Sequence, residues 1–292
     1  MLPTEGWALC GDNQDRIFQM STESRPRLLL APQNLVTLGN LACGVGALVL
    51  ITHALLRDDP RLLNHAAWWL VLAAVLDAVD GKVARLTGTA STMGAQLDSL
   101  ADAVAFGTAP GVLAATMVQV YGPELDIHMH PRLLVLAPIV YTCCAVLRLA
   151  RFNLEHEGDD PNQPHDAFVG LPSPAAAGVP VGLILLYHGI ADTRIVHFEP
   201  ETIALVREGI LISLPFVILA MALLMVSRIP YPHFTGWLTR SRGPVAPLAK
   251  IVIFIGVLTL EPELALAAFS LLYALIPLAM NIPMVWRNLR ED

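Results

Sequence analysis

Apolar stretches of about twenty residues recur along this 292-residue chain and constrain its fold more than any other feature. A helix of that length crosses the hydrocarbon core of a bilayer. The stretches predict eight transmembrane helices, near residues 35–56, 65–85, 96–120, 132–152, 173–192, 205–227, 246–260 and 263–286. An apolar share of 55% and a mean hydropathy of +0.58 agree with a chain that lies mostly in lipid. We therefore expect an all-α polytopic membrane protein.

The N-terminal segment, the net charge and the cysteines argue against several other classes of protein. We expect residues 1–24 to be a disordered segment without a signal peptide, and residues 25–292 to form one transmembrane domain that opens with a short basic interfacial segment. The formal charge of −7 lacks the basic footprint of a nucleic-acid-binding protein, so we expect no nucleic-acid partner. The four cysteines have no C-x-x-C spacing, which favours buried apolar side chains over disulfides or a zinc site.

The basic residues predict the orientation of the helices. Lysine and arginine collect in the cytoplasmic loops of membrane proteins. With the amino terminus inside, 13 of the 18 lysines and arginines face the cytoplasm and five face outward. Eight spans then place both termini in the cytoplasm. Within the spans, Gly44 and Gly46 predict close helix packing, and Gly107 and Pro110 predict a bend in the third helix.

Four aspartates lie where the second span ends and the third begins. Asp77 and Asp80 are three residues apart, and Asp98 and Asp102 are four apart, so each pair shares one face of its helix. A short turn within residues 86–95 would make the two helices antiparallel and bring the pairs together. An ionised carboxylate at membrane depth costs about 2.5–3.5 kcal/mol, and four such groups repel one another. Divalent cations would relieve this repulsion, and oxygen ligands favour Mg²⁺, Mn²⁺ or Ca²⁺.

Such a site suits phosphoryl chemistry. Two metal ions held by carboxylates neutralise a diphosphate and stabilise an oxygen leaving group. Arg85 lies about two turns beyond Asp77 and could bind a phosphate, while Gly81 and Ala84 leave room for a bulky group. One carboxylate could act as a general base on an attacking hydroxyl. The alternative is a proton relay or a carboxylate-based transporter, which also places acidic residues in membrane helices.

The full pattern resembles the motif of the CDP-alcohol phosphotransferases. It is Asp77-x2-Asp80-Gly81-x2-Ala84-Arg85-x8-Gly94-x3-Asp98-x3-Asp102. Further segments are similar to the membrane-embedded phosphatidylserine synthases of bacteria within that family: Pro32-x-Asn34 with Thr37 and Asn40, Ser99 to Pro110, Arg148-Leu-Ala-Arg151-Phe-Asn153 and Gly170-Leu-Pro-Ser-Pro-Ala-Ala-Ala177. The chain departs from the family at Ala105, where a serine is usual.

The resemblance implies a reaction and the residues that perform it. The phosphatidyl group of CDP-diacylglycerol would pass to the hydroxyl of L-serine, with release of CMP, at the cytoplasmic face of a bacterial inner membrane. Two Mg²⁺ or Mn²⁺ ions would be bound, and a homodimer is common in the family. The implied metal ligands are Asp77, Asp80, Asp98 and Asp102, with Asp102 also the catalytic base, and the implied CDP-binding residues are Gly81, Ala84, Arg85 and Gly94.

The alcohol acceptor is defined less closely by the pattern. The carboxylate of serine needs a cation, and Arg148 and Arg151 lie at the cytoplasmic end of the fourth span. The same arginines would serve equally well as positive-inside anchors. The core motif is shared by enzymes that use choline, inositol, glycerol phosphate or ethanolamine, so another alcohol remains an alternative to serine.

Overall fold

Helices make up nearly all of the described structure. The computed structural model describes residues 32–87, 92–156, 167–192, 199–232, 256 and 259–291. The helices are α3 (Pro32–Arg57), α4 (Arg61–Thr87), α5 (Thr92–Ala105), α6 (Ala109–Tyr121), α7 (Pro131–His156), α8 (Ser173–Gly189), α9 (Pro200–Val226) and α12 (Pro262–Glu291). Two 3-10 turns, η1 (Pro123–Leu125) and η2 (Ile190–Asp192), and two short strands, β1 (Ala167–Val169) and β2 (Pro230–Pro232), complete the described elements.

The chain is an all-α integral membrane protein. Among the described residues, six helical spans are long and apolar enough to cross a membrane: Asn34–Arg57, Arg61–Lys82, Met93–Tyr121, Pro131–Leu154, Pro200–Val226 and Pro262–Met280. Large apolar side chains cover the outside of these spans, as at Leu136 (55% exposed) and Leu223 (69% exposed), and such surfaces suit lipid. Helix α8 occupies the predicted fifth span but is only 17 residues long. The predicted span at 246–260 falls almost wholly outside the described residues, as do residues 1–24 and the basic segment after them.

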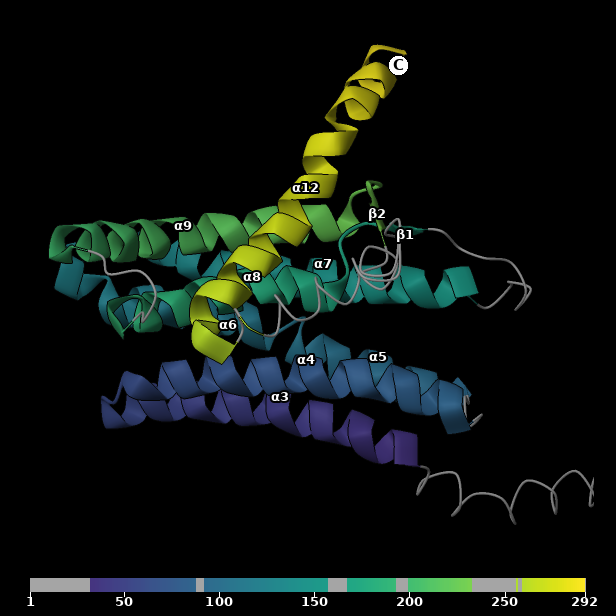
Figure 1. Cartoon of the computed structure of the whole chain (residues 1–292), viewed down its shortest axis with the longest axis horizontal. Coiled ribbons are helices and arrows are strands. Elements are labelled where there is room, and N and C mark those ends of the chain that lie inside the picture. Colours follow the sequence, from purple (N-terminus) through teal and green to yellow (C-terminus); the bar gives the residue numbers. More distant parts are fainter. Residues whose placement is uncertain are drawn as a thin grey trace, which may run out of the picture.

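The bundle has two ends, between which α3 runs beside α4 and α7 runs beside α9, while α12 crosses the bundle obliquely (Figure 1). One end holds the start of α3, the ends of α4, α7 and α9, and the two strands. The turn predicted over residues 86–95 is shorter than expected, because α4 continues to Thr87 and α5 already begins at Thr92. At the opposite end only three residues join α3 to α4. There Asp59 Oδ1 accepts a hydrogen bond of 3.2 Å from the backbone N–H of Arg61, which caps the start of α4.

The predicted third span is two helices with a break between them. Helix α5 ends at Ala105 and α6 begins at Ala109, which agrees with the bend expected from Gly107 and Pro110. The backbone N–H groups of Phe106 and Gly107 both donate to the carbonyl of Asp102, each across 2.9 Å. A Cβ atom at Gly107 would lie 2.6 Å from the carbonyl oxygen of Ala103, so this tight turn requires glycine. The break therefore follows directly after the last aspartate of the motif.

Small residues let α3 lie close to α4 and α5. A Cβ atom at Gly44 would lie 2.7 Å from Cα of Ala105, and one at Gly46 would lie 2.4 Å from the ring of Trp69. The prediction that these glycines serve helix packing is confirmed. Ala105, where the family usually has serine, is fully buried against Gly44. Close approach of α3 to both neighbours matters because it brings the polar residues of α3 next to the aspartates.

A two-stranded sheet ties the start of α8 to the end of α9. Strands β1 and β2 pair antiparallel, with Phe168 opposite Tyr231. Gly170 follows with a positive φ of 85°, and a Cβ atom there would lie 2.5 Å from the carbonyl oxygen of Met225. Burial, and secondarily the nearby Tyr273, raises the pKa of Tyr231 to about 12. Its hydroxyl therefore stays protonated and donates to the carbonyl of Ala274 across 3.3 Å, which joins the sheet to α12.

Candidate metal centre

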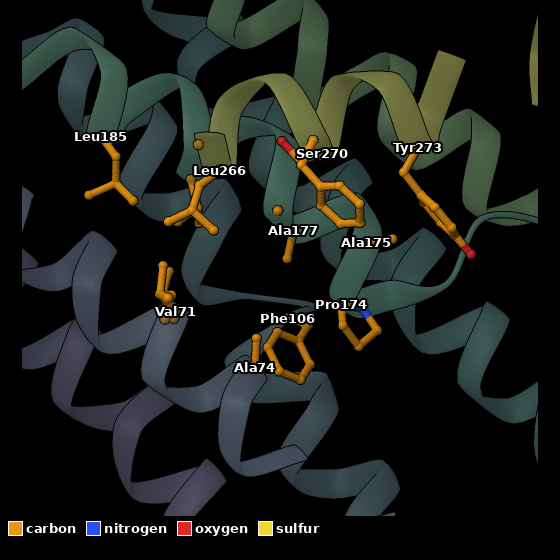
Figure 2. A pocket seen from close by; sticks show the side chains of 15 residues that line it. Val71, Ala74, Phe106, Pro174, Ala175, Ala177, Leu185, Leu266, Ser270 and Tyr273 are labelled. Atoms are coloured by element: carbon orange, nitrogen blue, oxygen red, sulfur yellow. The ribbon is translucent and has the colours of Figure 1, made fainter. Parts of the chain in front are cut away.

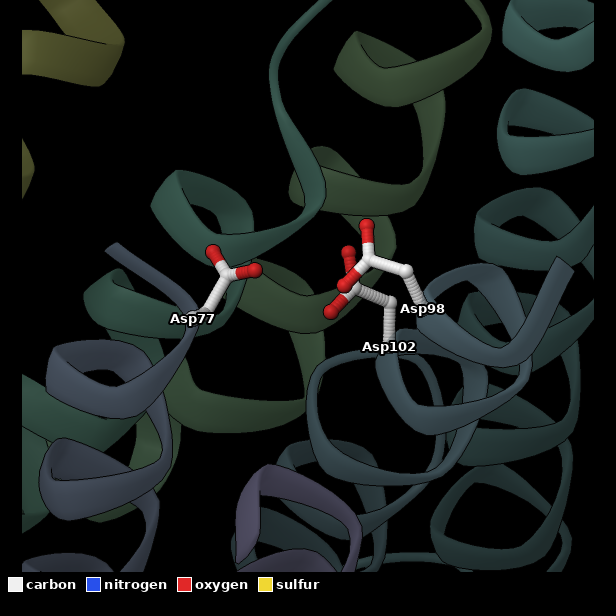
Figure 3. Close-up of side chains that lie close together, drawn as sticks. All are labelled: Asp77, Asp98 and Asp102. Atoms are coloured by element: carbon white, nitrogen blue, oxygen red, sulfur yellow. The ribbon is translucent and has the colours of Figure 1, made fainter. Parts of the chain in front are cut away.

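Three of the four predicted aspartates converge at one end of the bundle. Asp77 on α4 and Asp98 and Asp102 on α5 each offer a carboxylate oxygen, and these three oxygens lie within 4.8 Å of one another. Figure 3 shows the Asp77 side chain facing the other two across a shared space. Metal–oxygen distances of about 2.0–2.6 Å allow oxygens this close to share one ion or to bridge two neighbouring ions. The arrangement fits a divalent cation.

The fourth aspartate, Asp80, is adjacent but turned differently. It is 3% exposed and does not belong to the group of three. Its Oδ2 accepts a hydrogen bond from the hydroxyl of Thr37, while its buried Oδ1 has no hydrogen-bond partner among the described residues. The charge of Asp80 still acts on Asp77 and Asp98. A buried carboxylate oxygen without a donor suits a cation, so its role as a metal ligand stays a prediction that the geometry allows.

A polar stripe on α3 faces the aspartates. Asn34, Thr37 and Asn40 are spaced by three residues and are all at most 3% exposed. Nδ2 of Asn40 donates to Oδ1 of Asp102 across 3.2 Å. These residues belong to the segments that resemble the family, but no role at the site was expected for them. The signal that could have found them is a row of polar residues with helical spacing inside an otherwise apolar span.

Of the two arginines predicted to bind serine, Arg148 is the more deeply buried. It lies on α7, is 9% exposed, and donates from Nη1 to the hydroxyl of Ser173, the first residue of α8. Its guanidinium is among the charges that act on the carboxylate of Asp102. Arg151 lies one turn further along α7 and is half-buried. A buried arginine beside carboxylates is well suited to bind an anionic substrate group.

Another contact joins the end of α7 to α5. The side-chain amide of Asn153 donates to Oγ of Ser99 across 3.0 Å, and that hydroxyl lies 3.2 Å from Oδ1 of the same asparagine. Ser99 directly follows Asp98 on α5. The pair therefore anchors the helix turn that carries one of the clustered carboxylates. Both residues lie in segments that resemble the family, but their contact was not predictable from the sequence, because it joins positions 54 residues apart.

The predicted CDP-binding residues lie on the same two helices. Gly81 is exposed, and a Cβ atom built on it would meet nothing within 4 Å. Gly94 is buried in the first turn of α5. Ala84 and Arg85 fall in the last turns of α4, and their side chains lie outside the described part of the chain. The open space next to Asp80 would let a nucleotide approach α4. The CDP-binding roles of these four residues stay predictions.

Comparison with known proteins identifies the family. The sequence profile of the CDP-alcohol phosphatidyltransferases matches residues 30–226, which include α3 to α9 and every residue of the candidate centre. The chain belongs to this family. Members generally use divalent metals, and the group formed by Asp77, Asp98 and Asp102 is where this member could hold one. Helix α12 lies beyond the matched region.

Individual relatives carry one name, CDP-diacylglycerol–serine O-phosphatidyltransferase. The protein from Helicobacter pylori is 33% identical over 208 residues, which cover 71% of this chain and 76% of that relative. The one from Bacillus subtilis is 30% identical over 200 residues, covering 68% of this chain and 89% of the relative. The one from Mycobacterium leprae is 44% identical over 119 residues, covering 40% and 36%. All three names give serine as the acceptor alcohol of those relatives.

Proposed function

We propose that this protein transfers the phosphatidyl group of CDP-diacylglycerol to the hydroxyl of L-serine and releases CMP. The observation that carries the proposal is the convergence of Asp77, Asp98 and Asp102 at one end of a membrane bundle. The names of the relatives support serine as the acceptor. The product would be phosphatidylserine, a membrane phospholipid.

The four aspartates of the motif have two roles in the proposed reaction, metal binding and proton transfer. Asp77, Asp80, Asp98 and Asp102 would hold two Mg²⁺ or Mn²⁺ ions, which supply charge neutralisation for the diphosphate. Asp102 accepts the proton from the serine hydroxyl, and the serine oxygen then attacks the phosphorus that carries diacylglycerol. The bond between that phosphorus and the oxygen of CMP breaks. Direct in-line transfer inverts the configuration at phosphorus, and retention in a chiral-phosphorus substrate would contradict it.

Serine recognition is assigned to the arginines of α7. Arg148 is supported by its burial and by its charge, which acts on the carboxylate of Asp102, and Arg151 lies one helical turn further. A carboxylate bound by a guanidinium gains two parallel hydrogen bonds. Arg148→Ala or Arg151→Ala should raise the KM for serine far more than the KM for CDP-diacylglycerol. An unchanged KM for serine in both variants would mean that these arginines do not bind serine and serve only as positive charges on the cytoplasmic side.

The proposed site lies on the cytoplasmic side of the membrane. The site would face the cytoplasm at the inner membrane of a bacterium, with both termini on that side, because the basic residues divide 13 to five in favour of this orientation. Soluble serine then reaches the aspartates from the cytoplasm, and CMP is released to the same side. A homodimer, common in the family, is the expected assembly, and cross-linking in membranes would test it.

An alcohol panel tests the activity. Purified protein in detergent is given labelled CDP-diacylglycerol with serine, choline, inositol, glycerol phosphate or ethanolamine, in Mg²⁺, Mn²⁺ or a chelator. We expect CMP release with serine, dependence on metal, and loss of activity in Asp77→Asn and Asp98→Asn. The matched control is Asp58→Asn, because Asp58 is an exposed aspartate at the opposite end of the bundle.

Each alternative gives a different result in that panel. Product formation from choline and not from serine would replace the acceptor while keeping the chemistry. Ion flux in proteoliposomes without any CMP release would favour the transporter. Full activity in Asp98→Asn would contradict the metal-site assignment itself.

A further inference from the structure

An apolar cavity of about 190 Å³ lies between α4, α8 and α12 (Figure 2). Helix α4 contributes Leu70, Val71 and Ala74 to its wall, and α12 contributes four residues, which are Leu266, Phe269, Ser270 and Tyr273. Of the side chains along the wall, only those of Ser270 and Tyr273 carry polar atoms. The cavity is therefore suited to a hydrocarbon ligand rather than to a polar one.

The cavity wall includes residues that are close in sequence to the aspartates of the candidate metal centre. Ala74 lies three residues before Asp77 on the same face of α4, and Phe106 lies four residues after Asp102. Pro174 at the same end of the cavity follows Ser173, the partner of Arg148. A ligand whose phosphate lies at the carboxylates would thus have the cavity directly on its membrane side. Leu70 marks the far part, about 10 Å along α4 from Asp77 at 1.5 Å per residue.

Helix α12 is held firmly against the bundle where it closes the cavity. A Cβ atom at Gly182 of α8 would lie 2.8 Å from Cα of Ala267, so the two helices are as close as glycine allows. The hydroxyl of Tyr231 donates to the carbonyl of Ala274, the residue after Tyr273 of the cavity wall. The wall that α12 supplies is therefore a fixed surface, although α12 begins 36 residues after the end of the region matched by the family profile.

We propose that this cavity receives one acyl chain of the lipid donor, and that Leu266 and Phe269 of α12 determine which chains fit. The proposal rests on the proposed function, because CDP-diacylglycerol is the substrate whose reacting phosphate carries hydrocarbon chains. Transfer from bilayer to protein gains little hydrophobic free energy, since lipid is as apolar as leucine. The cavity consequently selects by shape and packing. Acyl selectivity is then a property of α12, outside the part of the chain that carries the motif.

A chain-length series tests the role of Leu266. CDP-diacylglycerols with acyl chains of four, eight and sixteen carbons are compared by kcat/KM, and by the rise in Tm that each lipid causes. Leu266→Trp fills the far part of the cavity, so its penalty should grow with chain length, from none at four carbons to about tenfold at sixteen. The matched control is Leu272→Trp, because Leu272 lies on the same helix and is 56% exposed.

A second variant tests the cavity in the opposite direction. Phe269→Ala enlarges the space and should raise the use of methyl-branched acyl chains relative to straight ones by about tenfold. The proposal would be overturned if Leu266→Trp had the same effect at all chain lengths, or no effect at any length. It would also be overturned if Phe269→Ala left the preference between branched and straight chains unchanged.

The design separates this proposal from the proposed function. The unsubstituted protein is assayed with the alcohol panel in the same experiment, and a different acceptor would change the function while leaving the chain-length comparison intact. If no alcohol gave CMP release, the lipid-induced rise in Tm would still show whether Leu266→Trp discriminates by chain length.

Discussion

Asn40 donates a hydrogen bond from Nδ2 to Oδ1 of Asp102 across 3.2 Å. Three residues earlier on the same helix, Thr37 donates to Asp80. Helix α3 carries none of the predicted metal ligands, yet it binds one carboxylate on α4 and another on α5. Hydrogen bonds of this kind fix the direction in which a carboxylate presents its free oxygen to a metal. The centre is thus assembled by three helices.

The first prediction concerns these two donors. Asn40→Ala should weaken activation by Mn²⁺ and lower activity by about 10–100-fold, because Asp102 loses the donor that orients it. The same loss is expected for Thr37→Val, while Thr37→Ser should restore most of the activity because it keeps the hydroxyl. The measurement is CMP release as a function of Mn²⁺ concentration.

The control for these variants is Thr52→Val. Thr52 lies on the same helix, but its hydroxyl donates to the carbonyl of Leu48 on its own helix and to no aspartate of the described residues. It should leave Mn²⁺ activation unchanged. If Thr37→Ser were as impaired as Thr37→Val, the hydroxyl would not be the group that matters.

The second prediction concerns stability and metal. Bringing three carboxylates together costs free energy, so a divalent cation should raise the Tm, with a gain of about 2.7 kcal/mol at a concentration of 100 Kd. Asp98→Asn removes one charge from the group, and we expect it to raise the Tm of the metal-free protein and to abolish most of the rise with Mg²⁺. Thermal unfolding in chelator and in Mg²⁺ measures both effects. A full Mg²⁺ response in Asp98→Asn would contradict the metal-site assignment.

The spacing of the aspartates was enough to predict where the centre lies. Pairs three and four residues apart at adjoining helix ends lie at the same depth once the helices run antiparallel, and Asp77 indeed meets Asp98 and Asp102, although Asp80 does not join them. Six of the eight predicted membrane spans were likewise predictable from their apolar length, because the described residues contain six helices long and apolar enough to cross a membrane. Both inferences depend only on local periodicity, which the sequence displays directly.

The contacts between distant helices were not predictable in the same way. The turn of Asp80 toward Thr37 and the contact of Asn153 with Ser99 depend on how far each helix is rotated about its axis. That rotation is set by close approaches such as Gly44 against Ala105, which a single sequence does not encode locally. The position of α12 over α8 likewise depends on Gly182, whose packing partner is 85 residues away in the chain.

The third prediction concerns Ser173, which is fully buried and accepts a hydrogen bond from Arg148. Ser173→Ala removes an acceptor from a buried charged donor, a loss of about 1.5–3 kcal/mol in such bonds. If Arg148 binds the serine carboxylate, the KM for serine should rise by about tenfold while the KM for CDP-diacylglycerol changes little.

Ser213→Ala is the matched control for this variant. Ser213 is a serine on α9 whose hydroxyl donates only within its own helix, to Ile210. Steady-state kinetics with each substrate varied in turn gives both constants. A parallel rise of both KM values in Ser173→Ala would indicate a general disturbance of the site and not a role in positioning Arg148.

The fourth prediction concerns Gly81, which combines an exposed position in the interior of α4 with open space around it. Alanine in a helix interior is favoured over glycine by about 0.5–1 kcal/mol, so Gly81→Ala should raise the stability of the protein. If the CDP group approaches α4 at this point, the same change should lower kcat/KM for CDP-diacylglycerol, and Gly81→Leu should lower it much further. Stability and activity would then change in opposite directions, which a purely structural glycine does not produce.

Gly209→Ala provides the comparison for Gly81→Ala, because Gly209 is likewise exposed in a helix interior, with nothing within 4 Å of a Cβ atom. It should give the same gain in Tm and leave kcat/KM unchanged. Thermal unfolding and initial rates on the same preparations measure both quantities. Full activity in Gly81→Leu would mean that the nucleotide does not contact this face of α4, and the CDP group would then have to lie nearer Gly94 on α5.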